Sequence, residues 1–226
     1  MSSWTGRPED PASRISAEAV STGDATRWFD ELYKAAAGDA SVIPWADLAP
    51  NPWLVEWLDR EHLVTEGSTA VVVGCGLGDD AEELARRGYD VVAFDISETA
   101  IEWAKQRSPD TPVEYRNADL FSLPKPMEGA FDFVFDAYTI QSLPETLRSQ
   151  AIASVASLVA PGGTVLVVAR GRDAGEDLGG PPWPLSHDEL RGFEHAGLLE
   201  DRFEDFTDDK RAQPVRRFRA SYVRPA

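Results

Sequence analysis

The stretch best suited to binding a ligand is a glycine-rich turn that follows a run of apolar residues. Gly74, Gly76 and Gly78 alternate with Cys75 and Leu77, directly after three consecutive valines. Glycines at these positions let the chain turn sharply and let a ligand lie against bare backbone. We therefore expect the turn to join a buried strand to a helix and to form part of a cofactor site.

Three carboxylates near this turn indicate which cofactor it would bind. Asp95 ends the next apolar run, where its side chain could accept hydrogen bonds from both hydroxyls of a ribose. Asp79 and Asp80 begin the helix after the turn, where two negative charges would repel a pyrophosphate. S-adenosylmethionine has a sulfonium and an ammonium group and no phosphate. The charges therefore favour this methyl donor over NAD, whose motif also places the third glycine one residue later.

Strand-like and helix-like runs alternate along the chain from residue 69. This order predicts an α/β fold with a doubly wound, mostly parallel seven-stranded sheet, helices on both faces and an antiparallel last strand. The expected strands span 70–73, 91–94, 113–116, 131–135, 164–169, 199–206 and 215–223. The expected helices in this part span 79–87, 97–105, 144–158 and 186–195.

The last expected strand alternates between apolar and polar side chains. Phe218, Ala220 and Tyr222 would face one way, and Arg217 and Arg219 the other. Such alternation is typical of an antiparallel strand with one face in solvent. We therefore expect the arginine face to be wet.

The residues before the alternating pattern form a separate segment of one domain. Residues 1–14 are rich in Ser, Pro and Gly and are expected to be flexible, and 15–226 to form a single domain. Within it, 15–62 would be a helical cap and 63–226 a Rossmann-like core. The cap would contain a helix over 15–37, an aromatic loop and a second helix beginning at Pro52.

The composition bears on partners and location. The chain has 39 acidic and 22 basic residues, a net charge of −17, which disfavours nucleic acid and anionic membranes as partners. One cysteine excludes an internal disulfide and a cysteine-rich metal site, and no metal site is expected. Since no apolar run suits a signal peptide or a membrane span, we expect a cytoplasmic protein.

The motifs together resemble the class I S-adenosylmethionine-dependent methyltransferases. The matching segments are 71–78, 95–97, 117–121, 131–138 and 158–163. The resemblance implies that Asp119 binds the adenine amino group and that Leu120 lies beside the ring. It assigns cofactor contacts to Gly74, Cys75, Gly76, Gly78, Asp79, Asp95, Ile96, Asp119, Leu120 and Asp136.

The N-terminal aromatic residues are similar to those of the thiopurine and halide/thiol methyltransferase group. The similarity rests on residues 28–33, on Pro44 and Trp45, and on 51–54. It implies that Trp28 and Trp45 fold over the donor and the acceptor pocket. The alternative is that the tryptophans of this segment are core residues.

The end of the fourth expected strand should border the methyl acceptor. Asp136 and Tyr138 are our candidates for positioning it, and the segment lacks the Asn/Asp-Pro-Pro-aromatic pattern of enzymes that methylate amides and base amines. We expect a small-molecule acceptor: a thiol, halide, hydroxyl or amine. Residues 171–185, with Trp183, would form a lid over it.

Three other functions stay open at this stage. The chain could act on a macromolecule with a small activator protein bound at the free edge of strand 113–116. It could also bind S-adenosylmethionine without catalysis. An NAD-dependent oxidoreductase fits the glycine spacing least well.

Overall fold

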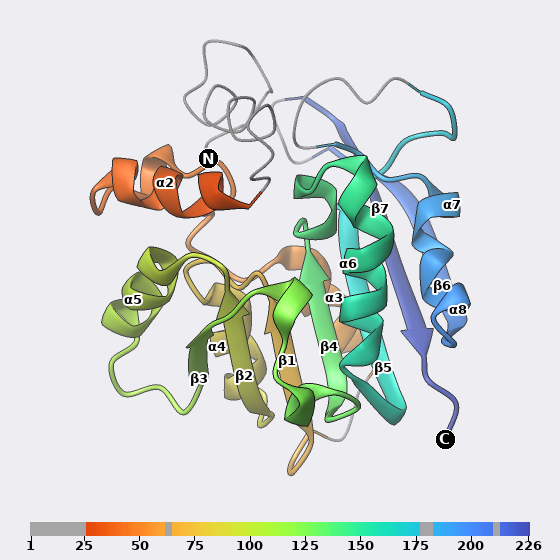
Figure 1. Ribbon diagram of the computed structural model, residues 1–226, viewed down its shortest axis with the longest axis horizontal. Helices are drawn as coiled ribbons and strands as arrows, with labels where there is room; N and C mark the ends of the chain where they lie inside the picture. Colours follow the sequence, from red (N-terminus) through yellow and green to blue (C-terminus); the bar gives the residue numbers. More distant parts are fainter. Residues whose placement is uncertain (1–25, 62–64, 177–182, 210–212) are drawn as a thin grey trace.

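The fold is built on one seven-stranded sheet (Figure 1). The computed structural model describes residues 26–61, 65–176, 183–209 and 213–226. The strand order is β3-β2-β1-β4-β5-β7-β6, and β7 runs antiparallel to both of its neighbours. The predicted doubly wound sheet with an antiparallel last strand is confirmed.

The strands lie close to the predicted ranges. They are β1 (Thr69–Val73), β2 (Asp90–Asp95), β3 (Glu114–Asn117), β4 (Phe131–Ala137), β5 (Val159–Arg170), β6 (Leu199–Asp208) and β7 (Val215–Val223). The main difference is β5, which begins five residues before the predicted strand. Its first residue already pairs with Phe131, and the register shifts before regular pairing resumes at Phe133.

The helices also follow the predicted order. They are α2 (Arg27–Ala36), α3 (Pro52–Glu61), α4 (Asp79–Arg86), α5 (Glu98–Arg107), α6 (Glu145–Ser157), α7 (His187–Leu190) and α8 (Gly192–His195). The single helix predicted over 186–195 is two short helices that meet at Arg191. The predicted flexible 1–14, and the part of helix 15–37 before residue 26, lie outside the described residues.

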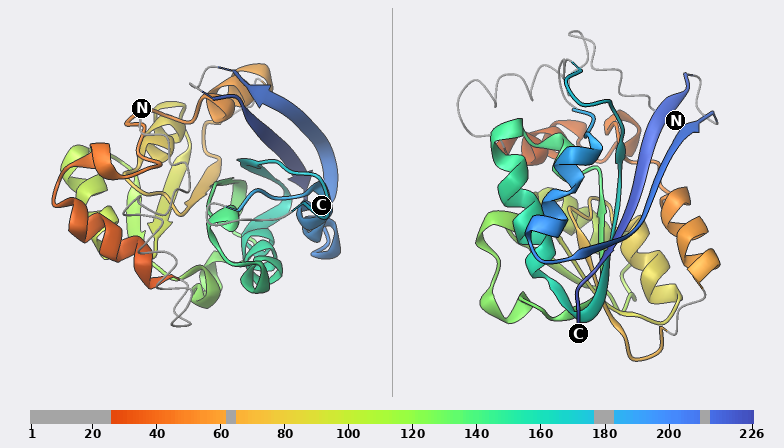
Figure 2. Two further views of the ribbon diagram at one scale, coloured as in Figure 1. Left: turned by 90° about the horizontal axis from the view of Figure 1, so that it is seen from above. Right: turned by 90° about the vertical axis from the view of Figure 1, so that its right-hand side faces the viewer.

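The core fills both faces of the sheet, because successive strand residues point to opposite sides. In β1, Ala70 and Val72 pack with α3, α4 and α5. Val71 and Val73 pack on the other face, with α6, α7 and α8. Figures 1 and 2 show these two helical layers. The layers hold the carboxyl ends of the parallel strands at one edge of the molecule.

The predicted N-terminal cap divides into two parts with different packing. α3 covers the sheet, where Trp57 stacks on Phe133 at 5.4 Å between ring centroids. α2 instead packs through Trp28, Leu32 and Tyr33 against a small cluster that includes α5. Among the described residues of the cap, α2 and the loop before α3 therefore lie at the carboxyl ends of the strands rather than on a face of the sheet.

The prediction that β7 has one face in solvent is wrong. Arg217, Arg219 and Ser221 are at most 3% exposed. β7 lies between β5 and β6, and α3 covers its arginine face: Arg219 donates to the Trp53 carbonyl oxygen at 3.0 Å. The alternation shows which side chains share a face, but not what covers that face. Arg211, a further arginine shortly before β7 in the chain, lies outside the described residues.

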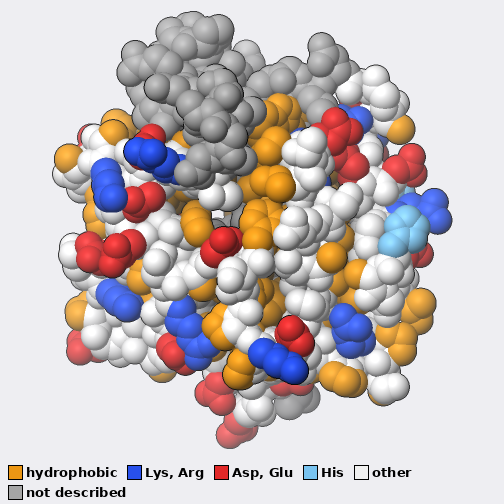
Figure 3. All heavy atoms as spheres, viewed as in Figure 1, with side chains coloured by type: hydrophobic (Ala, Val, Ile, Leu, Met, Phe, Trp, Pro, Cys, Tyr) orange, Lys and Arg blue, Asp and Glu red, His pale blue; other side chains and the backbone are white. Residues whose placement is uncertain are grey.

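The surface charges are mixed on the face seen in Figure 3, where basic and acidic side chains alternate. Within the described ranges, no helix combines the length and apolar character needed to cross a bilayer. The same residues contain no group of three His, Cys, Asp or Glu side chains that could hold a metal ion.

Candidate active site

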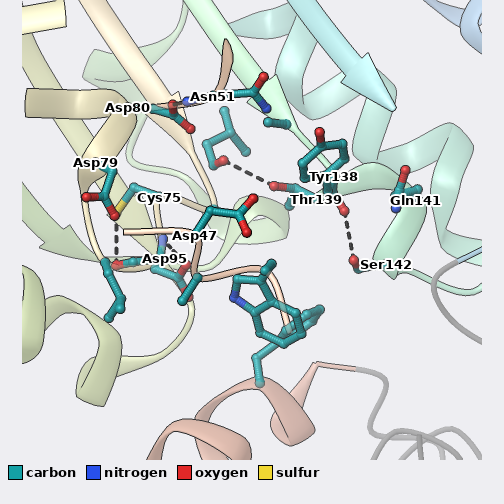
Figure 4. A pocket seen from close by; sticks show the side chains of 18 of the residues that line it. Asp47, Asn51, Cys75, Asp79, Asp80, Asp95, Tyr138, Thr139, Gln141 and Ser142 are labelled. Atoms are coloured by element: carbon teal, nitrogen blue, oxygen red, sulfur yellow. Dashed lines mark hydrogen bonds between the residues drawn. The ribbon is translucent and has the colours of Figure 1, made fainter. Parts of the chain in front are cut away.

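A cavity of about 490 Å³ opens at the carboxyl ends of β1, β2 and β4. One end is lined by the glycine turn and Asp95, and the other by residues that follow β4, among them Tyr138 and Gln141. The loop between α2 and α3 closes one side. In Figure 4, Asp47 of this loop lies between the two groups of residues. The sheet therefore brings together the predicted donor and acceptor regions.

The glycine turn has the conformation that its residue types require. Gly74, Gly76 and Gly78 have φ of 59°, 52° and 88°, a region that side chains disfavour. A Cβ on Gly78 would collide with the hydroxyl of Tyr115, and one on Gly74 with the side chain of Thr139. Gly74 and Gly76 line the cavity, but Gly78 does not. The third glycine therefore allows close packing against Tyr115, and its predicted cofactor contact stays a prediction.

Asp95 is fixed at the end of β2 with its carboxylate at the cavity. Its two oxygens accept hydrogen bonds from the backbone N–H groups of Gly76 and Ser97, each at 2.9 Å. Burial raises the pKa of Asp95, and these hydrogen bonds oppose the rise. Since each carboxylate oxygen can accept more than one hydrogen bond, Asp95 can also accept from a ligand hydroxyl. Ile96 beside it lines the cavity too.

The two acids at the start of α4 have different environments. Both line the cavity, but Asp79 forms a bidentate ion pair with Arg107 at 2.7 and 3.0 Å. Asp80 accepts from the backbone N–H of Asn51 at 2.6 Å, and burial raises its pKa to about 7. Neither residue is a free negative charge. Arg107 therefore offsets part of the negative charge expected at the start of α4, and nothing in the sequence indicates this ion pair.

Asp119 and Leu120 line the cavity next to the donor end, as the resemblance implies. Asp119 caps a short 3₁₀ helix (Leu120–Ser122) by accepting from the backbone N–H of Phe121 at 2.9 Å. This cap fixes the direction of the carboxylate. Phe121 adds a further apolar contact that the sequence analysis did not name.

The aromatic wall of the cavity comes from the segment before α3. Trp45 lines the cavity and donates through Nε1 to the Tyr33 hydroxyl at 2.7 Å. Trp28 does not line it: it is 1% exposed and stacks on Phe29 at 4.1 Å. Phe29 and Tyr33 line the cavity where Trp28 was expected, and the sequence analysis did not name them as site residues. Their spacing of four residues puts them on one side of α2, which was the available signal.

The acceptor end is built around Tyr138, one of three described non-glycine residues with positive φ (66°). Its carbonyl oxygen accepts from the Ser142 hydroxyl at 2.7 Å, and its side chain lines the cavity. Thr139 and Gln141 lie beside it. The unusual backbone directs the strand end into the cavity, as the prediction for Tyr138 requires.

Asp136 is not among the residues that line the cavity, and its predicted role in binding stays a prediction. It lies on β4 between Val73 and Val167 in register, and neither carboxylate oxygen has a hydrogen bond of good geometry. Burial raises its pKa to about 7, which the nearby Thr139 hydroxyl and Ile140 N–H offset in part. Asp136 faces the α6 side of the sheet, as Val134 does two residues earlier, whereas Tyr138 follows the end of β4, where its positive φ breaks the strand alternation.

The predicted lid is described only at its two ends. Neither 171–176 nor 183–185 lines the cavity, and 177–182 lies outside the described residues. Trp183 donates through its backbone N–H to the carbonyl oxygen of Gln141 at 3.0 Å. The lid stays a prediction. Cys75 lines the cavity, and burial raises the pKa of its thiol.

Four charged residues at the cavity were missed by the sequence analysis. They are Asp47, Arg170, Asp208 and Arg217. Arg170 is the last residue of β5, where the same strand-end reasoning could have found it. Asp47, Asp208 and Arg217 come from elements whose place next to the cavity is not written in local sequence.

The donor end fits S-adenosylmethionine. It offers Asp95 for ribose hydroxyls, Asp119 for an amino group and bare backbone at Gly74 and Gly76. A Cβ on Gly76 would come within 3.0 Å of the Tyr33 hydroxyl, so the wall at that point is shaped by the missing side chain. These groups can hold an adenosine and keep the space in front of Tyr138 for a second molecule.

Comparisons with known proteins agree with this geometry. The family model for thiopurine S-methyltransferase matches residues 37–223. A probable thiol methyltransferase 2 of Arabidopsis thaliana is 29% identical over 176 residues, 72% of this chain and 74% of that protein. A ubiquinone biosynthesis O-methyltransferase of Chromobacterium violaceum is 29% identical over 152 residues, 66% of this chain; the match spans 60% of that protein's length.

Solved structures show the same fold. The magnesium protoporphyrin IX methyltransferase of Synechocystis PCC 6803, crystallised with S-adenosylmethionine, superposes with a TM-score of 0.60. The two chains are 20% identical, and 76% of each is covered. Because the family model covers most of the chain, the resemblance found in the sequence is confirmed. The chain belongs to the thiopurine S-methyltransferase family of class I S-adenosylmethionine-dependent methyltransferases.

Proposed function

We propose that this protein transfers the methyl group of S-adenosylmethionine to a sulfur or oxygen nucleophile of a small molecule. The observation that carries the proposal is one continuous cavity with Asp95 at one end and Tyr138 at the other. Its volume of about 490 Å³ lies within the range of small-molecule sites. The thiol and O-methyltransferases among its relatives support both nucleophiles.

The residues present suit a reaction that depends on alignment. S-adenosylmethionine, when bound, supplies a methyl group activated by the sulfonium. The acceptor lone pair would form the new bond to carbon while the donor's carbon–sulfur bond would break, with the electron pair of the broken bond staying on the donor sulfur. The proton of an acceptor thiol or hydroxyl would be released to solvent. Asp95 and Asp119 would fix the donor, and Trp45 and Tyr33 would exclude water. Tyr138 would position the acceptor.

Partners and location follow from composition rather than from the site. The mixed surface charge and net charge of −17 support small molecules over nucleic acid. A cytoplasmic location stays a prediction. β3 does lie at the sheet edge, as expected for an activator site, but the comparisons give no support for an activator, and our proposal includes none.

The proposal is tested first by calorimetry and then by turnover. We expect saturable binding of S-adenosylmethionine and no binding of NADH. The loaded protein should then release S-adenosylhomocysteine when given simple aromatic thiols or phenols. Donor binding without turnover across both panels would reduce the protein to a donor-binding protein. Binding of NADH alone would contradict the proposal.

A further inference from the structure

The acceptor end contains a buried arginine whose hydrogen bonds are incomplete. Arg217, on β7, lines the cavity with its side chain 3% exposed. Its Nε has no hydrogen-bond partner, and its ion pair with Asp208 is 3.6 Å long. A charge-assisted hydrogen bond is normally 2.7–2.9 Å. Buried N–H donors in proteins are nearly always hydrogen-bonded. The unpaired Nε of Arg217 therefore indicates that the guanidinium can donate to a further acceptor.

Arg219 shows what a purely structural arginine looks like in the same place. It lies two residues further along β7, on the same face and equally buried. Its guanidinium makes four hydrogen bonds of 2.7–3.0 Å, to Glu204, Glu56 and the carbonyl oxygen of Trp53. The contrast separates an arginine that is satisfied by the fold from one that is not.

Two further contacts place Arg217 where an acceptor would bind. Its guanidinium lies 5.1 Å from the centre of the Tyr138 ring, a cation–π contact that orients it. Arg170 is its cross-strand partner on β5, and both line the cavity. Like charges directly opposite each other on a sheet are unfavourable. The Asp208 carboxylate already offsets part of this repulsion. A further anion beside the two arginines would offset more of it.

We propose that Arg217 binds an acidic group of the methyl acceptor, so that the substrates are thiols or hydroxyl compounds that also carry a carboxylate. This inference rests on the proposed function and adds the substrate class. A protein with a charge of −17 repels anions at long range, so selection for an acidic substrate needs a local cation of this kind.

The test compares two acceptors that differ in one group: 3-mercaptobenzoate and 3-methylbenzenethiol. The measured quantity is the ratio of their kcat/KM values, from release of S-adenosylhomocysteine. We expect the wild-type ratio to favour the carboxylate at least tenfold. In Arg217→Met the ratio should fall toward one, mainly through KM for 3-mercaptobenzoate. Arg217→Lys should keep part of the preference.

Arg216→Met is the matched control, because it removes the same charge from the adjacent residue. Arg216 points away from the cavity and pairs with Asp205 and Asp173 on the surface. The ratio of kcat/KM values for the two acceptors in Arg216→Met should equal the wild-type ratio. If both variants change the ratio alike, or if the wild type shows no preference, the proposal is wrong.

A binding measurement separates this proposal from the proposed function. Calorimetry of the S-adenosylhomocysteine complex would compare 3-(methylthio)benzoate with methyl 3-methylphenyl sulfide, and needs no turnover. Tighter binding of the carboxylate, lost in Arg217→Met, would support the anion site even if catalysis failed. Equal binding of both compounds would overturn the anion site while leaving methyl transfer intact.

Discussion

Asp95 combines two tasks, because it holds the glycine turn and faces the donor. Asp95→Asn removes its charge, and we expect the dissociation constant of S-adenosylmethionine to rise about 10–100-fold, the effect of losing about 1.5–3 kcal/mol of charge-assisted hydrogen bonding. Calorimetry measures it. Asp90→Asn is the control, since Asp90 is exposed at the opposite end of β2. Equal effects of the two variants would contradict the site.

Asp136 is expected to make stability depend on pH. Its pKa is about 7 in the folded protein, against an ordinary value of 3.8. Between these values the folded state keeps a proton that the unfolded state has released, so stability falls as pH rises. The contribution is fully present below about pH 4 and is lost as the pH passes through 7.

Asp136→Asn should abolish this part of the pH dependence. The difference in Tm between variant and wild type should therefore increase from pH 5 to pH 8. The titration is worth about 2.5 kcal/mol over this interval, and the Tm of a domain of this size changes by about 2–4 °C per kcal/mol. Thermal unfolding at the two pH values measures the difference. The same difference at both values would show that Asp136 is ionised throughout.

At the scale of residues, the sequence predicted the strand-end positions better than the helical ones. Asp95, Asp119 and Tyr138 line the cavity because parallel strands end at one edge of a sheet. Trp28 does not, because the rotation of α2 about its axis decides which aromatic faces the cavity. Residue type alone carries no information about that rotation.

At the scale of elements, one carboxylate of α2 adds hydrogen bonds to α5 beside the apolar packing between the two helices. Asp30 accepts from the Ser97 hydroxyl at 2.8 Å and from the Thr99 N–H at 3.2 Å, and Ser97 in turn caps α5. Burial raises the pKa of Asp30, but its hydrogen bonds outweigh this effect. The hydrogen bond with Lys34 is the largest of them, and together they lower the pKa to about 2. The attachment is therefore retained down to acidic pH and lost only as the pH falls through 2.

Breaking this attachment should loosen the aromatic wall without unfolding the sheet. We expect Asp30→Ala to weaken donor binding about three- to tenfold, because α2 carries two residues that line the cavity, with a loss of about 1 kcal/mol in unfolding free energy. Donor titration and urea unfolding measure the two effects. Glu31→Ala, which removes an exposed pair with Arg27, should change neither. A large loss of stability with unchanged donor affinity would contradict this role.

The positions of the strands along the chain were predicted better than the elements that pack against each strand. Local sequence patterns locate a strand but do not give its neighbours in the sheet. Apolar runs and glycine turns locate β1, β2 and β4 within two residues at each end. Both faces of β7 are buried because α3 covers its arginine face and α7 and α8 pack in the cluster on the other, and no local pattern encodes this coverage. Arg217 was not predicted as a cavity residue for the same reason.

At the scale of the whole molecule, the net charge of −17 should reduce stability through long-range repulsion. Raising NaCl from 0.05 to 0.5 M shortens the screening length, and we expect Tm to rise by a few degrees. Thermal unfolding across the series measures it, and KCl should give the same curve. A fall in Tm would mean that the surface ion pairs contribute more than the repulsion costs.

The position of β7 also constrains how the protein is made. β7 fills the gap between β5 and β6, although it follows both in the chain. During synthesis, a nascent chain that has emerged only as far as residue 209 therefore exposes two unpaired strand edges, which can recruit other chains. The sheet can close, and Arg217 can reach the cavity, only after β7 has left the ribosome. Folding of the acceptor end therefore waits for β7, and the interval before β7 emerges is when aggregation should compete most strongly.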